Sequence, residues 1–190
     1  MTMPATEPVS LAEMFAYMKN VTADDEAPIS HLIAAARDWI ETYTQRHLIT
    51  RTVIYRIDSF PARDIAILEL PGGTIQSVTS IEYVDSAGVS QTLASAAYEV
   101  DTDSEPGRIN LAYSQVWPTI REWGLPITIT YVSGYGDNPG DVPERIRTAI
   151  MRIVSELYEY DMDTIVAVPI SRVPWSTRML VSRFRLKNIF

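Results

Sequence analysis

The stretch from Asp24 to Ile57 reads DDEAPISHLIAAARDWIETYTQRHLITRTVIYRI, and the period of its apolar residues changes part-way along. In the first part they recur every three or four positions, as on one face of an α-helix. These residues are Ile29, Leu32, Ile33, Ala36, Ile40 and Tyr43. From Thr50 they alternate, as in a half-buried strand. Because the acidic run 24–26 and Pro28 suit a helix start, the sequence predicts a helix to about Arg46, followed by a strand.

Two further helices are predicted, one on each side of this stretch. Ser10-Leu11-Ala12-Glu13 is a capping box, in which the serine oxygen accepts a backbone N–H and the glutamate reaches back, so a short helix should run to about Asn20. Farther along, Asp141 can cap and Pro143 can open a third long helix that ends near Asp161. Its apolar face consists of Ile146, Ile150, Ile153, Val154 and Leu157.

Short strand-like runs fill the region between the long helices. They cover residues 51–57, 65–70, 78–84, 90–93, 98–100, 108–111 and 127–132. Turn signals rich in glycine and proline separate these runs, at the spacing expected of an antiparallel meander or a small sandwich.

This order predicts the α+β class: a small antiparallel bundle of two or three helices, an inserted antiparallel β module and an extended C-terminal arm. We expect N-terminal helices in 1–48, the β module in 49–133, the third long helix completing the bundle in 134–165, and the basic arm in 166–190.

Composition excludes several classes of site. The chain of 190 residues has no cysteine and only two histidines, so disulfides, thiolate metal sites and most zinc or iron sites are not expected. A net charge of −8 argues against binding of nucleic acid by the body of the protein. No apolar run approaches the ~18 residues of a membrane span, so we expect a soluble protein made in the cytoplasm, with no membrane contact.

The sequence contains no arrangement of residues that is typical of an enzyme active site. The glycine loop 134–140 lies between a strand and a helix but lacks the lysine of phosphate-binding loops, so a structural turn is the interpretation. Asp101, Asp103 and Glu105 alternate like the start of a calcium loop, yet Pro106 stands where the sharp turn requires glycine. We therefore predict no catalytic, cofactor-binding or metal-binding residues, and no cofactor.

The C-terminal stretch 166–190 differs in charge from the rest of the chain. It carries +5 and no acidic residue, whereas the other residues carry −13. Apolar residues such as Trp175, Met179 and Phe184 are interleaved with the basic ones. Two interpretations remain, an arm that another protein orders and a segment folded back on its own domain, and the unpaired charge favours the arm. For Trp117 and Trp123 of the β module, core packing and a protein contact both remain open.

The order and spacing of helix caps, turns and core positions resemble the head-to-tail connector (adaptor) family of long-tailed bacteriophages and related gene-transfer particles. The resemblance is carried by Ser10–Glu13, Ala34–Arg37, Glu41–Arg46, Phe60-Pro61, Leu70–Gly73, Val78–Asp85, Tyr131–Gly136, Val142-Pro143, Glu156–Glu159, Met179-Leu180 and Phe184-Arg185. It covers nearly the whole chain.

The resemblance implies a structural, non-enzymatic protein of the virion neck, forming a ring of about twelve copies beneath the portal. It implies that the C-terminal arm docks on the portal, through Arg172, Trp175, Arg178, Met179, Leu180, Arg183, Phe184, Arg185 and Lys187. Loops near Gly88, Trp117 and Trp123 would face a tail or stopper protein or a neighbouring copy. DNA would pass through the acidic ring without specific binding.

Two alternatives remain. One is another neck or tail-completion protein, with the β module as the working part, and the other is a cytoplasmic enzyme with an acidic surface. If the connector interpretation holds, truncation after Val168 should abolish portal binding and leave the fold intact.

Overall fold

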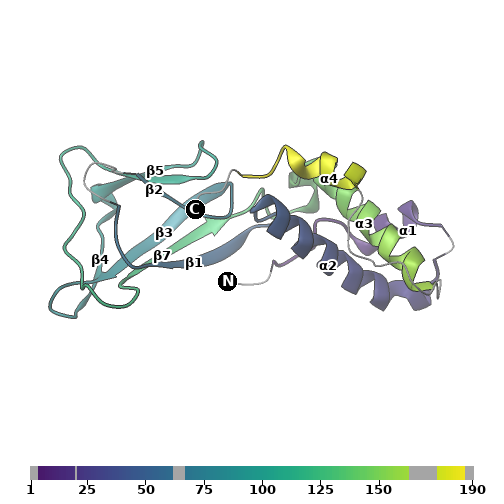
Figure 1. The fold of residues 1–190 in the computed structure, drawn as a ribbon, viewed down its shortest axis with the longest axis horizontal. Helices are drawn as coiled ribbons and strands as arrows, with labels where there is room; N and C mark the ends of the chain where they lie inside the picture. Colours follow the sequence, from purple (N-terminus) through teal and green to yellow (C-terminus); the bar gives the residue numbers. More distant parts are fainter. Residues whose placement is uncertain (1–3, 20, 62–66, 163–174, 187–190) are drawn as a thin grey trace. The chain divides into compact units, whose positions relative to one another are not determined.

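The computed structural model describes residues 4–19, 21–61, 67–162 and 175–186. They form two compact units, one that contains residues 4–49 and 135–185 and another that centres on residues 50–134 (Figure 1). The first is helical and the second consists of antiparallel strands, so the predicted α+β class is confirmed.

The described residues of the helical unit form four α-helices: α1 (Leu11–Tyr17), α2 (Glu26–Thr44), α3 (Glu144–Met162) and α4 (Trp175–Ser182). Short 3₁₀ helices at Ala23–Asp25 and Pro139–Asp141 precede α2 and α3. Apolar residues of all four α-helices share one core, which consists of Val9, Met14, Ile29, Ile33, Ala36, Ile40, Leu48, Ile49, Val142, Ile146, Ala149, Ile150, Ile153, Val154 and Val181. None of the described helices combines the length and the apolar character that a membrane span requires.

The helix boundaries follow local chemistry. The capping box of α1 is confirmed, because the Glu13 N–H donates to the Ser10 hydroxyl and the Ser10 N–H donates to the Glu13 carboxylate. Helix α2 ends at Thr44, and its C-cap residue Gln45 adopts a left-handed conformation with φ of 59°. The prediction that Asp141 caps the third helix is wrong: its carboxylate accepts the Asn138 N–H at 2.9 Å and closes the preceding 3₁₀ turn instead.

The β unit contains two antiparallel sheets. One has the order β1-β7-β3-β4, formed by Arg51–Ile57, Ile127–Ser133, Ile75–Val84 and Ser90–Thr92. The other has the order β2-β6-β5, formed by Ile67–Glu69, Arg108–Leu111 and Tyr98–Asp101. Their facing side chains form a second core of Val53, Leu68, Leu70, Ile75, Ile81, Ile109, Ile127, Ile129 and Tyr131. The unit is therefore a small sandwich rather than a meander.

Strand β3 begins three residues earlier than the sequence pattern predicts. Its pairing with β7 shifts register between Ile75 and Ser77 and again between Val78 and Ser80. Each shift inserts an extra residue, Gln76 or Thr79, and this breaks the alternation of apolar and polar positions. The alternation of apolar and polar residues therefore did not show where β3, the longest strand, begins.

The prediction of an extended C-terminal arm is wrong for the part that the structure describes. Trp175–Ser182 form α4, and Val181 is fully buried in the helical core. Apolar residues of this segment are buried against α2 and α3. This burial accounts for the difference, because leaving these residues in water would cost more free energy than forming the helix does. The remainder of the predicted arm, residues 166–174 and 187–190, lies outside the described residues.

Candidate functional site

The described C-terminal segment is seated on the helical unit by its apolar side. Val181 is buried within the core, and Leu180 and Phe184 pack partly against it. Thr177, one turn earlier, is also buried. These positions recur at helical spacing, so α4 presents one face to its own domain, and among the described residues none packs on the opposite face.

Polar and aromatic contacts hold the end of this segment. The Arg46 Nε donates a hydrogen bond to the carbonyl oxygen of Phe184. The Arg185 guanidinium lies 5.5 Å from the ring centroid of Tyr43, which stacks on Trp39 with ring centroids 5.2 Å apart. A cation over an aromatic face is attracted by the ring quadrupole, so Arg185 helps to hold the end of this segment against α2.

The outward side of α4 is basic and apolar. Met179 of α4 is 51 % exposed, and the side chains of Arg183 and Arg185, which follow the helix, are exposed. Arg178 is half-buried, and its Nε has no hydrogen-bond partner among the described residues. Residues 175–186 contain no acidic side chain. Such a surface suits an acidic and apolar protein partner.

The residues predicted to bind the portal thus divide into groups. Met179, Arg183 and Arg185 are exposed, whereas Leu180 and Phe184 pack against the core. Arg172, Lys187 and the side chain of Trp175 lie outside the described residues. Because Val181 belongs to the core, truncation after Val168 is now expected to destabilise the helical unit rather than leave it intact.

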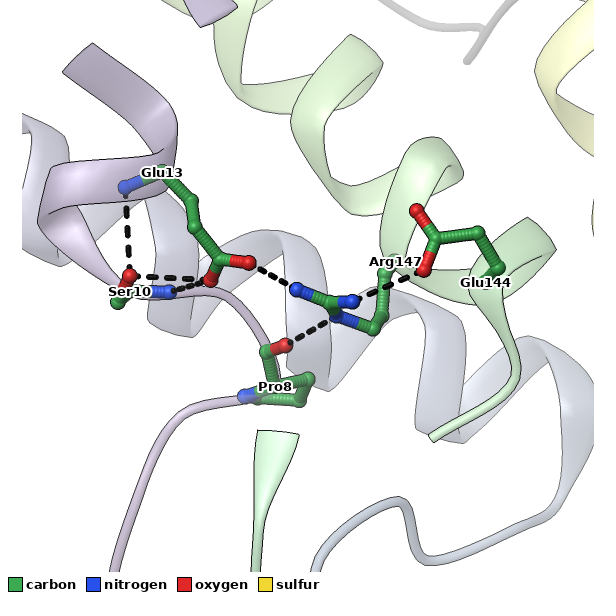
Figure 2. Close-up of polar contacts among 5 residues, drawn as sticks. All are labelled: Pro8, Ser10, Glu13, Glu144 and Arg147. Atoms are coloured by element: carbon green, nitrogen blue, oxygen red, sulfur yellow. Dashed lines mark hydrogen bonds and ion pairs between the residues drawn. The ribbon is translucent and has the colours of Figure 1, made fainter. Parts of the chain in front are cut away.

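A second cluster fixes the N-terminal segment to α3 (Figure 2). The Arg147 guanidinium donates to the carbonyl oxygen of Pro8 at 3.1 Å and to the carboxylates of Glu144, at 2.9 Å, and Glu13. The pKa of Glu13 is lowered, first by the Ser10 N–H and further by the Ser10 hydroxyl and Arg147. Sequence inspection missed this cluster, because no local pattern links Arg147 to a residue so far away in the chain.

The Gly88 loop is a tight hairpin turn between β3 and β4. Gly88 has φ of +83°, which favours glycine, and the Asp85 carboxylate accepts the N–H groups of Val89 and Ala87. These hydrogen bonds, that from Val89 first, lower the pKa of Asp85. Ile120 forms a bridge with Asp85, so the loop before β7 lies against the base of the hairpin.

The two predicted tryptophans have different surroundings. Trp117 is half-buried and stacks on Phe60, with ring centroids 4.6 Å apart, so core packing is confirmed for it. Trp123 is 79 % exposed. Three further apolar residues of the same loop are exposed, Tyr113, Val116 and Leu125, and two of them, Val116 and Leu125, were not singled out from the sequence. The signal in the sequence that could have identified them was the high density of apolar residues in a loop with few charged ones.

The family of the protein follows from comparison with known proteins. The family model of the head completion protein (HCP) matches residues 8–167, which is most of the chain. The chain belongs to the head completion protein family. This confirms the resemblance drawn from the sequence, and it identifies a structural rather than an enzymatic protein.

Solved structures share the fold of this head completion protein. A chain from the neck of an empty gene transfer agent particle, computed with C6 symmetry, has a TM-score of 0.75 and 22 % identity, over 96 % of this chain and 92 % of that one. A chain from a native gene transfer agent virion gives 0.74 and 23 %, over the same shares. One from a native neck with C12 symmetry gives 0.68 and 23 %, over 95 % and 90 %. No curated protein matches the chain.

The polar clusters of this head completion protein are structural. Asp101 accepts N–H groups from Asp103 and Ser104, so its carboxylate organises a turn. Within the described ranges, no group of histidine and acidic side chains could hold a metal ion. In the glycine loop, a Cβ on Gly136 would collide with the Asp141 carboxylate, which explains the glycine by packing.

Proposed function

We propose that this head completion protein is a connector that assembles as a ring of about twelve copies in the neck of a virion, beneath the portal, and joins head to tail. The family and the shared fold with neck proteins of gene transfer agent particles support this proposal. The acidic body fits the same role, because a ring of copies with −13 outside the C-terminal stretch would let DNA pass without binding it.

The portal contact is assigned to the outward side of α4. The observation that carries it is the combination of Met179, exposed on α4, and Arg183, exposed just past the end of α4, in a described segment, residues 175–186, that contains no acidic side chain. A portal surface with carboxylates around an apolar pocket would pair the arginines and bury the methionine. The assignment of Arg172, Trp175 and Lys187 to portal binding stays a prediction from the sequence.

A binding experiment with the portal protein tests this assignment. The double variant Met179→Ala/Arg183→Ala is expected to bind the portal at least about tenfold more weakly, because both changes lie outside the core and remove contacts. Arg145→Ala, which removes an exposed arginine of α3, serves as the matched control and should bind normally. Equal portal affinity of the double variant and the control would refute the portal role of α4.

The tail side is assigned to the β3–β4 hairpin. Its tip at Gly88 and Val89 is exposed and stabilised by Asp85, so it forms a rigid projection. Substitution of Val89 by Asp should impair tail joining while portal binding stays normal, as measured by particle assembly and by portal affinity. Loss of both activities together, with the fold intact, would argue against a two-sided connector.

The second candidate is a tail-completion protein whose β unit alone contacts its partner. The exposed Trp123 loop favours it. In that case the α4 variants would bind the portal normally, and only β-unit variants would impair assembly.

A further inference from the structure

Among the described elements of the β unit, none packs on the outer face of the sheet β1-β7-β3-β4. Its inner face packs on the sheet β2-β6-β5, through Val53, Ile81 and Ile129. The strand registers place the alternate residues in three rows on the outer face. The rows are Thr52–Val132–Ser77, Ile54–Thr130–Ser80 and Arg56–Thr128–Glu82–Thr92. All ten side chains are half-buried or exposed, with Ile54 55 % exposed.

This outer face is nearly free of charge. Of the ten residues in these rows, Arg56 and Glu82 are charged and have opposite signs, while the other eight are threonine, serine, valine or isoleucine. Solvated sheet faces usually carry many charged side chains. The contrast is sharp within this unit, because residues 50–134 contain five basic and ten acidic residues, a net charge of −5.

The loop between β6 and β7 is also nearly neutral, and it is apolar. Residues 112–126 contain one arginine and one glutamate. Tyr113 is 96 % exposed, and Val116, Trp123 and Leu125 are each more than half exposed. Ile120 pairs with Asp85, and the Arg121 N–H donates to the Val84 carbonyl at 3.0 Å. These two backbone contacts attach the loop to the end of β3, so the loop projects in a defined position.

We propose that the Tyr113–Leu125 loop of one copy docks on the outer face of the β1-β7-β3-β4 sheet of the next copy. The inference rests on the proposed ring, because a cyclic assembly needs two unlike patches on each subunit. A nearly uncharged face rich in threonine, serine, valine and isoleucine and a projecting loop with Tyr and Trp anchors are two such patches.

Charge selects a second copy as the occupant. Copies that each carry −8 repel one another, so they meet most favourably where both surfaces are close to neutral. The outer face and the loop are both of this kind. Nucleic acid does not suit either patch, because each offers a single arginine.

Disulfide trapping tests the contact directly, because the natural chain has no cysteine. The double variant Thr130→Cys/Trp123→Cys, oxidised at high protein concentration, is expected to form a ladder of covalent multimers. A mixture of the two single variants should give a covalent dimer, whereas each single variant alone should stay monomeric. The control is Asn110→Cys/Trp123→Cys, since Asn110 lies on the other sheet. A ladder no stronger than that of the control overturns the proposal.

Complementation of charge variants gives a second test. Thr130→Glu should block the face, and Trp123→Ala should weaken the loop, each reducing self-association at least about tenfold by analytical ultracentrifugation. Mixed together, the two should form a dimer through the one intact pair of patches and nothing larger. Asn110→Asp, which adds the same charge on the other sheet, should associate normally, and circular dichroism would show that each variant is folded.

The results also separate this inference from the proposed function. A ring seen in the neck by electron microscopy, together with portal binding but without 123–130 cross-links, would leave the connector role standing and overturn the docking of loop on sheet. Cross-linking in a protein that never binds a portal would do the reverse.

Discussion

The Nε of Arg46, which lies just past the end of α2, donates a hydrogen bond to the carbonyl oxygen of Phe184, 138 residues later in the chain. The next residue, Arg185, lies over the ring of Tyr43 on α2. The end of the C-terminal segment is therefore held by two contacts to the same helix end, and the position of the proposed portal-binding surface depends on them.

Arg46→Ala is expected to lower the free energy of unfolding by about 1–3 kcal/mol, because hydrogen bonds from charged donors contribute that much and a partly buried carbonyl loses its partner. Denaturant unfolding measures the loss. Hydrogen exchange should show lower protection in residues 180–186 than elsewhere in the helical unit. Uniformly lowered protection would contradict a local role for Arg46.

Arg147→Ala removes the donor shared by Pro8, Glu13 and Glu144. The Glu13 side chain is 40 % exposed, so water compensates part of its loss, and we expect destabilisation of about 1–2 kcal/mol. Arg145→Ala, at an exposed position two residues away on the same helix, should change stability by less than about 0.5 kcal/mol. Thermal unfolding of the two variants side by side checks the difference, and equal effects would count against the cluster.

Stability is expected to depend on pH through Glu13. Its pKa in the folded protein is lowered from the ordinary value of 4.5, first by the Ser10 N–H. A lowered pKa contributes stability above the ordinary value, and that contribution is lost as the pH falls through the folded value. The fall in unfolding free energy between about pH 7 and about pH 3.5 should therefore be smaller in Glu13→Gln than in the unchanged protein. A Glu122→Gln control should follow the unchanged protein, and identical slopes for all three would refute the role of Glu13.

Gly107 has no room for a side chain. A Cβ at this position would lie 2.4 Å from the Ile75 Cγ1 and 2.7 Å from the Ile75 Cβ, in the core of the β unit. Gly107→Ala is expected to destabilise the protein by about 1–3 kcal/mol, the usual cost of overpacking. Gly140→Ala places its Cβ in open space and should be close to neutral. Denaturant midpoints of the two variants test the contrast, and a neutral Gly107→Ala would show that Ile75 can move aside.

Local patterns were enough for most of the secondary structure. The Ser10–Glu13 box, the change of period after Arg46 and the glycine turns predicted α1, α2 and most strands, because capping, amphipathic spacing and turn conformation depend on near neighbours. The two bulges of β3 were concealed, since a bulge is defined by pairing with β7 and not by β3 itself.

The candidate surfaces were only partly readable. Trp117 and Trp123 look alike in sequence, yet stacking on Phe60 half-buries one and leaves the other exposed. The residues of the neutral outer face of the sheet could not be identified from the sequence. Its rows combine residues from four strands, and only the pairing of the strands determines which residues lie side by side.

By itself, the sequence determined the helices, the turns, the acidic body and the basic C-terminal stretch, since each depends on composition or on spacing along the chain. Only the tertiary structure decided that α4 folds back on α2 and α3, that Arg46 and Arg147 hold distant segments, and which aromatic residues are exposed. The physical reason is that burial and hydrogen bonding over long sequence separations depend on the packed core and leave no periodic signal in the chain.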